Sequence, residues 1–363
     1  MNAARVRVLI VDDSAIARDL LERGLSADPA IEVVGKAADA YAARDKIVFL
    51  NPDVVTLDVE MPRMDGIEFL KRLLPQYPVP VVIVSAVTAE GSRRALEALE
   101  AGAVEVVAKP AAGDRDGLAG MIASLRTAIH EASRANVTTL RRYAPAPART
   151  APAAGGPRKS RLSGSGAERI IAIGASTGGT TALTTVITAL PADAPPVVVV
   201  QHMPPVFTRM FAESLDKQSR VTVKEAADGD VLERGLALIA PGDRHLTVAR
   251  EGTVFKARLD DRPKVRGHRP SVDVLFESLA RIAGPRSIAL VLTGMGRDGA
   301  DGLLSLRRAG ARCFAQDEAS SVVFGMPKEA WENGAAERLV PLESAAAELI
   351  ACLSAGVAGG VTP

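Results

Sequence analysis

The chain has 363 residues, of which 44 are Lys or Arg and 43 are Asp or Glu, so its formal net charge is only +1. A charge this close to neutral gives no reason to expect nucleic-acid binding, and the length allows two domains with separate cores. Two cysteines, Cys313 and Cys352, are too few for a disulfide framework and favour a reducing compartment.

The N-terminal sequence does not resemble a secretory signal. Its apolar run, residues 8–11, is short and stops at Asp12 and Asp13. No uninterrupted apolar stretch approaches the roughly 18 residues that a membrane-spanning helix needs. We therefore expect a cytoplasmic protein without membrane insertion.

The first third of the chain alternates between short β-branched runs and helix-like stretches. Helical patterns, such as residues 15–27 and 66–74, separate the runs. This alternation predicts a doubly wound α/β domain with a parallel sheet of five strands. The expected strands are residues 6–11, 31–37, 54–57, 81–85 and 104–107.

Five polar side chains follow the ends of four of these runs: Asp12 and Asp13 the first, Asp58 the third, Ser85 the fourth and Lys109 the fifth. An isolated Asp-Asp pair is usually a solvated strand end. Here the first and third strands should be neighbours, so three carboxylates converge and favour a hard cation such as Mg²⁺. Lys109 would add a fixed positive charge, and Ser85 a hydroxyl for a phosphoryl oxygen. The set suits phosphoryl transfer to a carboxylate.

Residues 1–132 resemble a response-regulator receiver domain over nearly their whole length, which implies a flavodoxin-like fold. Many receivers carry Phe or Tyr three residues before the lysine, but Val106 stands there in this chain, so a switch by aromatic rotation is not expected. The resemblance implies these roles: phosphoacceptor for Asp58, Mg²⁺ ligands for Asp12 and Asp13, and switch pair for Ser85 and Lys109.

Residues 133–167 differ in composition from the segments on either side. They are rich in Pro, Ala, Gly and Arg and hold no acidic residue. Such a segment cannot offset its ordering entropy by burial, which predicts a flexible linker. Its positive charge could recruit an acidic partner, although solvation of the linker is the simpler explanation.

After Glu168 the alternation of strands and helices resumes. Strands are expected near residues 170, 197, 236–239 and 288, and a β-hairpin around Glu251-Gly252. We expect a second doubly wound α/β domain over residues 168–355, mostly parallel with an antiparallel hairpin. Residues 356–363 would form a tail.

Three polar residues in this second half each come after a predicted strand: Ser176, His202 and Asp298. Active sites of open α/β sheets form at this rim. His202 could take the proton of the Ser176 hydroxyl, and Asp298 could fix the tautomer of the imidazole. Taken singly, Ser176 could cap a helix, His202 could be structural and Asp298 could belong to a turn. Their coincidence in one domain favours catalysis.

Glycines near these residues allow close backbone approach. Gly174 and Gly178 flank Ser176 in a G-x-S-x-G pattern, which permits a tight strand-to-helix turn. Glycines also flank Met295, so its N–H is our candidate oxyanion donor. The string Gly174-Ala-Ser-Thr-Gly-Gly179 could instead bind phosphate, but it lacks the lysine of a P-loop.

The whole pattern resembles the chemotaxis protein-glutamate methylesterases, in which a receiver domain is joined to a C-terminal esterase. The resemblance implies hydrolysis of receptor glutamate γ-methyl esters with release of methanol, and in some members deamidation of receptor glutamines. It implies an acyl-enzyme on Ser176 and a role for Thr177 in positioning His202. The strings that carry it are residues 174–179, 201–205, 268–273, 292–299 and 315–321.

The resemblance also implies partners and control. Methyl-accepting chemoreceptors would be the substrate and a chemotaxis histidine kinase the phosphodonor. The receiver would use Mg²⁺, and ester hydrolysis would need no cofactor. Phosphorylation is expected to activate the esterase. The alternatives are a non-catalytic, phosphorylation-dependent adaptor and, less well supported, a DNA-binding regulator, for which no basic recognition helix stands out.

Overall fold

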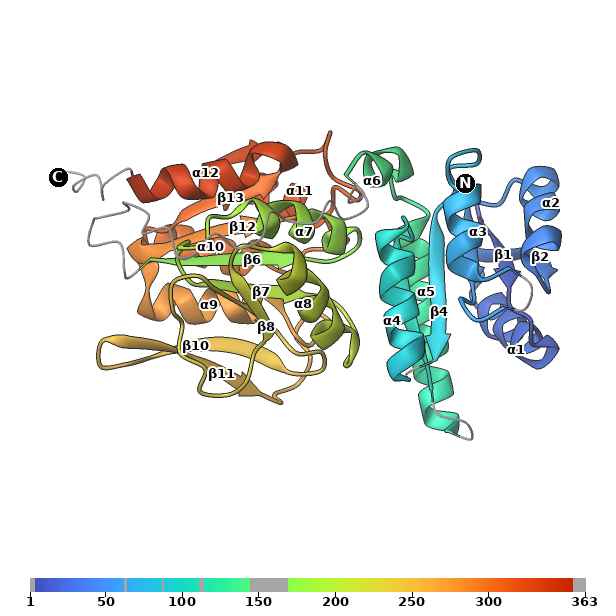
Figure 1. Cartoon of the computed structure of the whole chain (residues 1–363), viewed down its shortest axis with the longest axis horizontal. Coiled ribbons are helices and arrows are strands. Elements are labelled where there is room, and N and C mark those ends of the chain that lie inside the picture. Colours follow the sequence, from blue (N-terminus) through green and yellow to red (C-terminus); the bar gives the residue numbers. More distant parts are fainter. Residues whose placement is uncertain (1–3, 62–63, 87, 111–113, 144–168, 355–363) are drawn as a thin grey trace. The chain divides into compact units, whose positions relative to one another are not determined.

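The computed structural model describes residues 4–61, 64–86, 88–110, 114–143 and 169–354. The chain divides into two compact units, Met1–Ala144 and Pro145–Pro363, and each is described by itself (Figure 1). Residues 144–167 of the predicted linker and the predicted tail, 356–363, lie outside the described residues.

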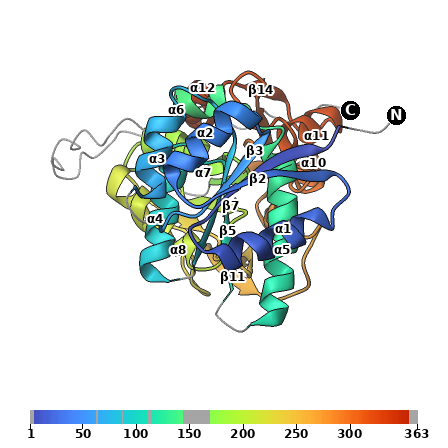
Figure 2. The ribbon, with the colours of Figure 1, turned by 90° about the vertical axis from the view of Figure 1, so that its right-hand side faces the viewer.

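The first unit is a parallel five-stranded sheet in the order β2-β1-β3-β4-β5. Helices cover both of its faces: Figure 2 shows α1 and α5 on one side, and α2, α3 and α4 on the other. The strands are β1 (Val6–Val11), β2 (Ile31–Ala37), β3 (Val54–Leu57), β4 (Val81–Ala86) and β5 (Glu105–Lys109). The helices are α1 (Ala15–Ser26), α2 (Ala40–Leu50), α3 (Gly66–Leu73), α4 (Ala89–Glu100), α5 (Arg115–Ala132) and α6 (Val137–Tyr143).

Apolar runs and polar caps set these elements. Strands covered on both faces read as continuous apolar sequence, and β3 is buried at every position. The helices begin where a side-chain oxygen accepts a backbone N–H, as Ser14 does for α1, Asp39 for α2 and Asp65 for α3. The predicted five-stranded parallel sheet is confirmed.

The second unit contains a parallel seven-stranded sheet in the order β14-β13-β12-β6-β7-β9-β8, and a separate antiparallel hairpin, β10-β11. Its strands are β6 (Ile170–Ala175), β7 (Val197–Gln201), β8 (Thr222–Glu225), β9 (Leu236–Ile239), β10 (His245–Glu251), β11 (Val254–Asp260), β12 (Ser287–Val291), β13 (Arg312–Gln316) and β14 (Arg338–Val340). Its helices are α7 (Gly179–Ala189), α8 (Phe207–Gln218), α9 (Val272–Ile282), the 3₁₀ turn Gly284–Arg286, α10 (Ala300–Arg308), α11 (Met326–Glu332) and α12 (Leu342–Ser354).

The mostly parallel sheet and the hairpin are confirmed, but three strands were not predicted. β8 and β14 are short edge strands, and β13 lacks the β-branched run that signalled its neighbours. β8 and β14 carry charged residues, which an edge position tolerates, whereas β13 is an inner strand that is mostly buried.

Strand β6 lies where the chain reverses its direction of travel across the sheet, with β12 on one side and β7 on the other. Gly174 is in register with both Val200 and Val291, and Val291 is in register with Ala315. Four adjacent strands therefore end at one level, which is where sites form in open α/β sheets. No helix among the described residues is long and apolar enough to cross a membrane.

Candidate active site

Ser176 occupies the sharp turn that joins β6 to α7. Gly178 has a φ of +75° there, and a Cβ on it would lie 2.6 Å from the Cβ of Val322, so both conformation and space require glycine. Ser176 is only 5% exposed, and its N–H donates to the carbonyl of Thr293 at 3.0 Å. The turn is therefore held in place at the carboxyl-terminal edge of the sheet.

His202 links Ser176 to Asp298. Its Nδ1 lies 3.2 Å from the Oγ of Ser176, and its Nε2 lies 2.8 Å from Oδ2 of Asp298. A carboxylate can only accept, so Nε2 carries the proton of the neutral ring and Nδ1 is left as acceptor for the serine hydroxyl. The structure therefore brings together all three residues that were predicted as a triad.

Asp298 is buried, at 1% exposure, but it is well supplied with donors. The Ser271 hydroxyl and the Val272 N–H each donate to it at 2.7 Å, and the Asp273 N–H donates at 3.1 Å. These groups form the N-terminus of α9, whose dipole favours a negative charge. Burial opposes ionisation, but the hydrogen bonds from His202, Ser271 and Val272 outweigh it and keep the pKa of Asp298 below its ordinary value.

Asp273 in turn caps α10, the helix that follows Asp298 in the chain. Its Oδ1 accepts from the N–H groups of Gly299 at 3.0 Å and Gly302 at 2.7 Å, at the start of α10. Its Oδ2 accepts from Nε of Arg266 at 2.9 Å. Burial raises the pKa of Asp273, and the negative charge of Asp298 adds to this rise. The two carboxylates thus cap each other's helices.

His268 covers the face of the His202 ring. The ring centroids are 3.8 Å apart, and the two planes are within 4° of parallel. Burial, and next the neighbouring His202, lower the pKa of His268 to about 4, so its ring is neutral at pH 7. A neutral, flat partner limits rotation of His202 without adding a like charge.

The loop that contains Met295 lies against the nucleophile turn. A Cβ on Gly294 would lie 2.7 Å from the Cβ of Ser176, so only glycine allows this approach. The hydroxyl of Thr293 also donates to the carbonyl of buried Thr177 at 2.9 Å. Met295 therefore follows directly after a residue that touches Ser176.

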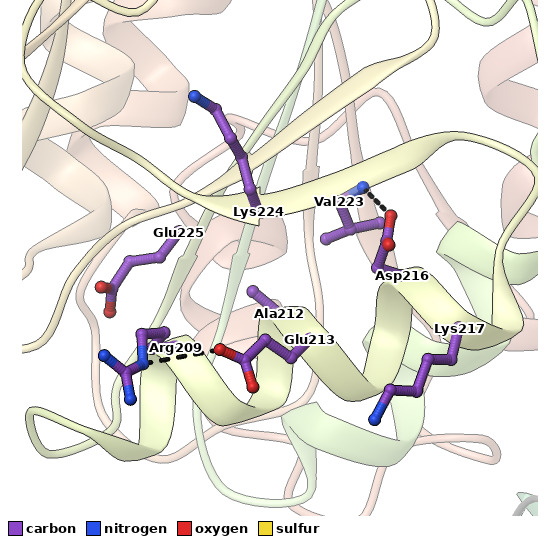
Figure 3. Close-up of a pocket in the computed structure, with 8 residues that line it drawn as sticks. All are labelled: Arg209, Ala212, Glu213, Asp216, Lys217, Val223, Lys224 and Glu225. Carbon is purple, nitrogen blue, oxygen red and sulfur yellow. Dashed lines mark hydrogen bonds and ion pairs between the residues drawn. The ribbon is translucent and has the colours of Figure 1, made fainter.

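A separate groove lies between α8 and β8 and has a volume of about 510 Å³ (Figure 3). None of Ser176, His202 and Asp298 is among the described residues that line it. Within it, Arg209 lies 3.5 Å from Glu213, and Asp216 accepts from the Val223 N–H at 2.7 Å. It is lined by Arg209, Ala212, Glu213, Asp216, Lys217, Val223, Lys224 and Glu225.

The first unit holds an acidic cluster at the ends of β1 and β3. Oxygen atoms of Asp12, Asp13 and Asp58 lie within 4.8 Å of one another. Nζ of Lys109, from β5, lies 3.0 Å from Asp12 and 2.5 Å from Asp58. Ser85, from β4, is buried and donates to the carbonyl of Gly91 at 3.0 Å.

The charges of this cluster are unbalanced, because three carboxylates lie together and the ammonium group of Lys109 pairs with just two of them, Asp12 and Asp58. Burial raises the pKa of Asp58, and Lys109 only partly offsets this effect. Burial opposes the charge of Lys109 as well, but the carboxylates of Asp58 and Asp12 outweigh it and raise the pKa of the ammonium group. Excess negative charge on oxygen ligands fits a hard divalent cation such as Mg²⁺.

Several residues around the triad were not predicted to have a role. Ser271 and Asp273 lie within a distinctive string of the sequence, and an amphipathic run after Ser271 could have marked it as a helix cap. His268, Gln201 and Gln316 also lie within distinctive strings, but no role was assigned to them, because their contacts with His202, Ser176 and Thr293 depend on the fold.

Comparison with known proteins gives consistent matches in both units. Residues 8–122 match the response regulator receiver domain family, and residues 171–349 match the CheB methylesterase family. A protein-glutamate methylesterase/protein-glutamine glutaminase of Syntrophotalea carbinolica is 50% identical over 96% of this chain and 98% of its own length. One from Pseudomonas aeruginosa is 50% identical over 95% of this chain and 96% of its own. The crystal structure of the Thermotoga maritima CheB methylesterase catalytic domain is 42% identical, with a TM-score of 0.50, and covers 51% of this chain and 98% of that one.

Proposed function

The chain belongs to the protein-glutamate methylesterase/protein-glutamine glutaminase family, and from this premise we propose how its own residues perform that activity. The substrate is the γ-methyl ester of glutamate residues in chemoreceptors, and the products are the free carboxylate and methanol. Glutamine side chains of the same receptors are deamidated with release of ammonia. The observation that supports this most strongly is the continuous contact from Ser176 through His202 to Asp298, at 3.2 and 2.8 Å.

Acylation begins at the serine hydroxyl. As Oγ of Ser176 attacks the ester carbonyl carbon, its proton passes to Nδ1 of His202. The tetrahedral intermediate collapses, and the departing methoxide takes that proton to leave as methanol. A water molecule then attacks the acyl-enzyme, gives a proton to Nδ1, and the proton returns to Oγ as the glutamate is released.

Charge develops at two places during these steps. The imidazolium that forms on His202 is stabilised by Asp298, which remains ionised because four donors surround it. The negative charge on the substrate oxygen would be met by the N–H of Met295, on the loop that Gly294 brings against Ser176. Thr177 contributes by joining the two loops through Thr293.

We propose that the receiver domain controls this site by phosphorylation of Asp58. A receiver domain implies a phosphodonor kinase, and the chemotaxis histidine kinase is the candidate. Asp12, Asp13 and Asp58 would hold Mg²⁺, which supplies neutralising charge beside the phosphoryl group. Lys109 already lies between Asp12 and Asp58, and the Ser85 hydroxyl would exchange the Gly91 carbonyl for a phosphoryl oxygen.

The test is methanol release from membranes that contain methylated receptors. Wild type and Ser176→Ala are compared, each with and without acetyl phosphate and Mg²⁺. Loss of a triad nucleophile costs on the order of 10⁶ in kcat. We expect release that requires Ser176 and rises with the phosphodonor. If wild type released no methanol under any condition, the non-catalytic adaptor would be the better explanation.

A further inference from the structure

Two buried glutamines are the last residues of strands on either side of the nucleophile strand. Gln201 ends β7 and Gln316 ends β13, and they are 2% and 1% exposed. The order β13-β12-β6-β7 places just two strands between them. We propose that Gln201 and Gln316 anchor a hydrogen-bond chain across these four strand ends, and that this chain positions Ser176 for attack. The inference rests on the proposed function.

Gln201 ties the nucleophile to its base. Its Nε2 donates to the carbonyl of Ser176 at 3.0 Å and to the carbonyl of His202 at 3.1 Å. Both amide hydrogens are therefore used, and the two carbonyls fix which way the amide points. Its Oε1 is buried with no hydrogen-bond partner among the described residues, and it lies 2.1 Å from where a Cβ on Gly179 would stand. The amide keeps this orientation although its oxygen gains no bond.

Gln316 holds the opposite end of the chain. Its Oε1 accepts from the N–H of Thr293 at 2.7 Å, and its Nε2 donates to the carbonyl of Ser320 at 2.8 Å. Thr293 in turn accepts from the N–H of Ser176 at its carbonyl and donates to the carbonyl of Thr177 through its hydroxyl. The chain therefore runs from Gln316 through Thr293 and Ser176 to Gln201.

This chain fixes both backbone groups of the nucleophile. The N–H of Ser176 is held from the β12 side by Thr293, and its carbonyl is held from the β7 side by Gln201. Hydrogen bonds in a buried, low-dielectric region are stronger and more rigid than exposed ones. Neither glutamine touches the reacting atoms in this structure, so both are positioning residues. Their effect is on the distance between Oγ of Ser176 and Nδ1 of His202.

The test uses full-length Gln201→Met and Gln316→Met, which keep the side-chain length and remove the amide. A displacement of about 1 Å at an active site can cost roughly 100-fold in rate. We expect the acylation rate to fall roughly 10- to 100-fold with an unchanged KM. Inactivation by a phosphonylating serine reagent should slow by the same factor, since it requires Ser176 and His202 but no receptor.

Ser278→Ala is the matched control. It removes a buried hydroxyl that accepts from the Val248 N–H and donates to the carbonyl of Leu275. It should lower Tm as the glutamine variants do, while both rates stay at the wild-type level. Equal rate losses in Ser278→Ala and Gln201→Met would show that the glutamines act only through general stability, and the proposal would be wrong.

Two further outcomes are decisive. If Gln201→Met reacts with substrate and reagent as fast as wild type, the chain does not position Ser176. If Gln201→Met does not fold, Gln316→Met decides in its place, because it removes the acceptor of the Thr293 N–H at the other end of the chain. Methanol release by wild type tests the proposed function separately. The serine reagent reacts without receptor, so it compares wild type with the variants even if the natural substrate is a different ester.

Discussion

The ring of His268 lies flat on the ring of His202, with centroids 3.8 Å apart and planes 4° from parallel. His268 is on the loop before α9, whereas His202 follows β7, so the contact joins two distant parts of the chain. It restricts the plane in which His202 can meet both Ser176 and Asp298. The stack therefore contributes alignment, whereas the proton transfer belongs to His202.

Removing the aromatic ring of His268 should lower kcat more than exchanging its imidazole for another flat ring. Aromatic pairs contribute about 0.5–1.5 kcal/mol beyond the area they bury, and 1.36 kcal/mol corresponds to tenfold in rate. We expect His268→Ala to lose up to about tenfold in kcat and His268→Phe to keep most of it. The measurement is ester hydrolysis at pH 7. Equal losses in both variants would show that the imidazole itself takes part.

The same residue should make the fold acid-sensitive. The pKa of His268 is about 4 in the folded chain and 6.5 in an unfolded one, so below pH 6.5 the unfolded state binds the extra proton. The stability that neutral His268 contributes is complete above pH 6.5 and is lost as the pH falls through 4. Between pH 6.5 and about 4, Tm should therefore fall less steeply with decreasing pH in His268→Phe than in wild type. Parallel curves for the two proteins would contradict this.

Asp298→Asn tests the electrostatic part of the triad. The amide NH₂ would face groups that already donate, namely Ser271, Val272 and His202. The hydrogen bond that fixes the tautomer of His202 would be lost, and the imidazolium would have no negative charge beside it. We expect kcat to fall about 10³- to 10⁴-fold. Single-turnover acylation gives the value, and Ser271→Ala, which removes just one of the donors, should cost far less.

Gly294→Ala tests the close approach of the Met295 loop. The added Cβ would stand 2.7 Å from the Cβ of Ser176 and 2.4 Å from the sulfur of Met326, so the loop must move away. We expect a loss of about 100-fold or more in kcat. Gly120→Ala is the comparison, since a Cβ there meets nothing within 4 Å in mid-helix and should leave hydrolysis unchanged. A fully active Gly294→Ala would remove the argument for an oxyanion donor on this loop.

Asp58→Asn tests the phosphoryl switch. The variant keeps a side chain of the same shape beside Lys109 but cannot form the acyl phosphate. We expect methanol release with and without acetyl phosphate to become equal, whereas in wild type the phosphodonor raises it. Persistent stimulation in Asp58→Asn would mean that the phosphodonor acts at another group.

The sequence was most informative where an apolar run stops at a charged residue. The bounds predicted for β1 and β3 agree with the structure because these are inner strands whose buried runs stop at an aspartate. The bounds of β2 agree as well, although it is an edge strand with Glu32 exposed. The meeting of Ser176, His202 and Asp298 followed from their places after strands of one parallel sheet.

The remaining features depend on contacts that no local pattern encodes. β14 has three residues, too few for a periodicity. His268 reaches His202 across 66 positions by a loop path that strand periodicity does not determine. Gln201 and Gln316 have the appearance of ordinary polar strand ends until the order of the sheet places them on either side of the nucleophile.

The reciprocal capping by Asp298 and Asp273 separates two kinds of evolutionary constraint. Asp298 anchors the start of α9 as well as His202, so a descendant that abandoned hydrolysis would still need its carboxylate to cap that helix. The Ser176 hydroxyl caps no helix, and its hydrogen-bond partner among the described residues is His202. In such a lineage Ser176 would be substituted before Asp298. A conserved aspartate at this position is therefore weak evidence that a homologue still hydrolyses esters.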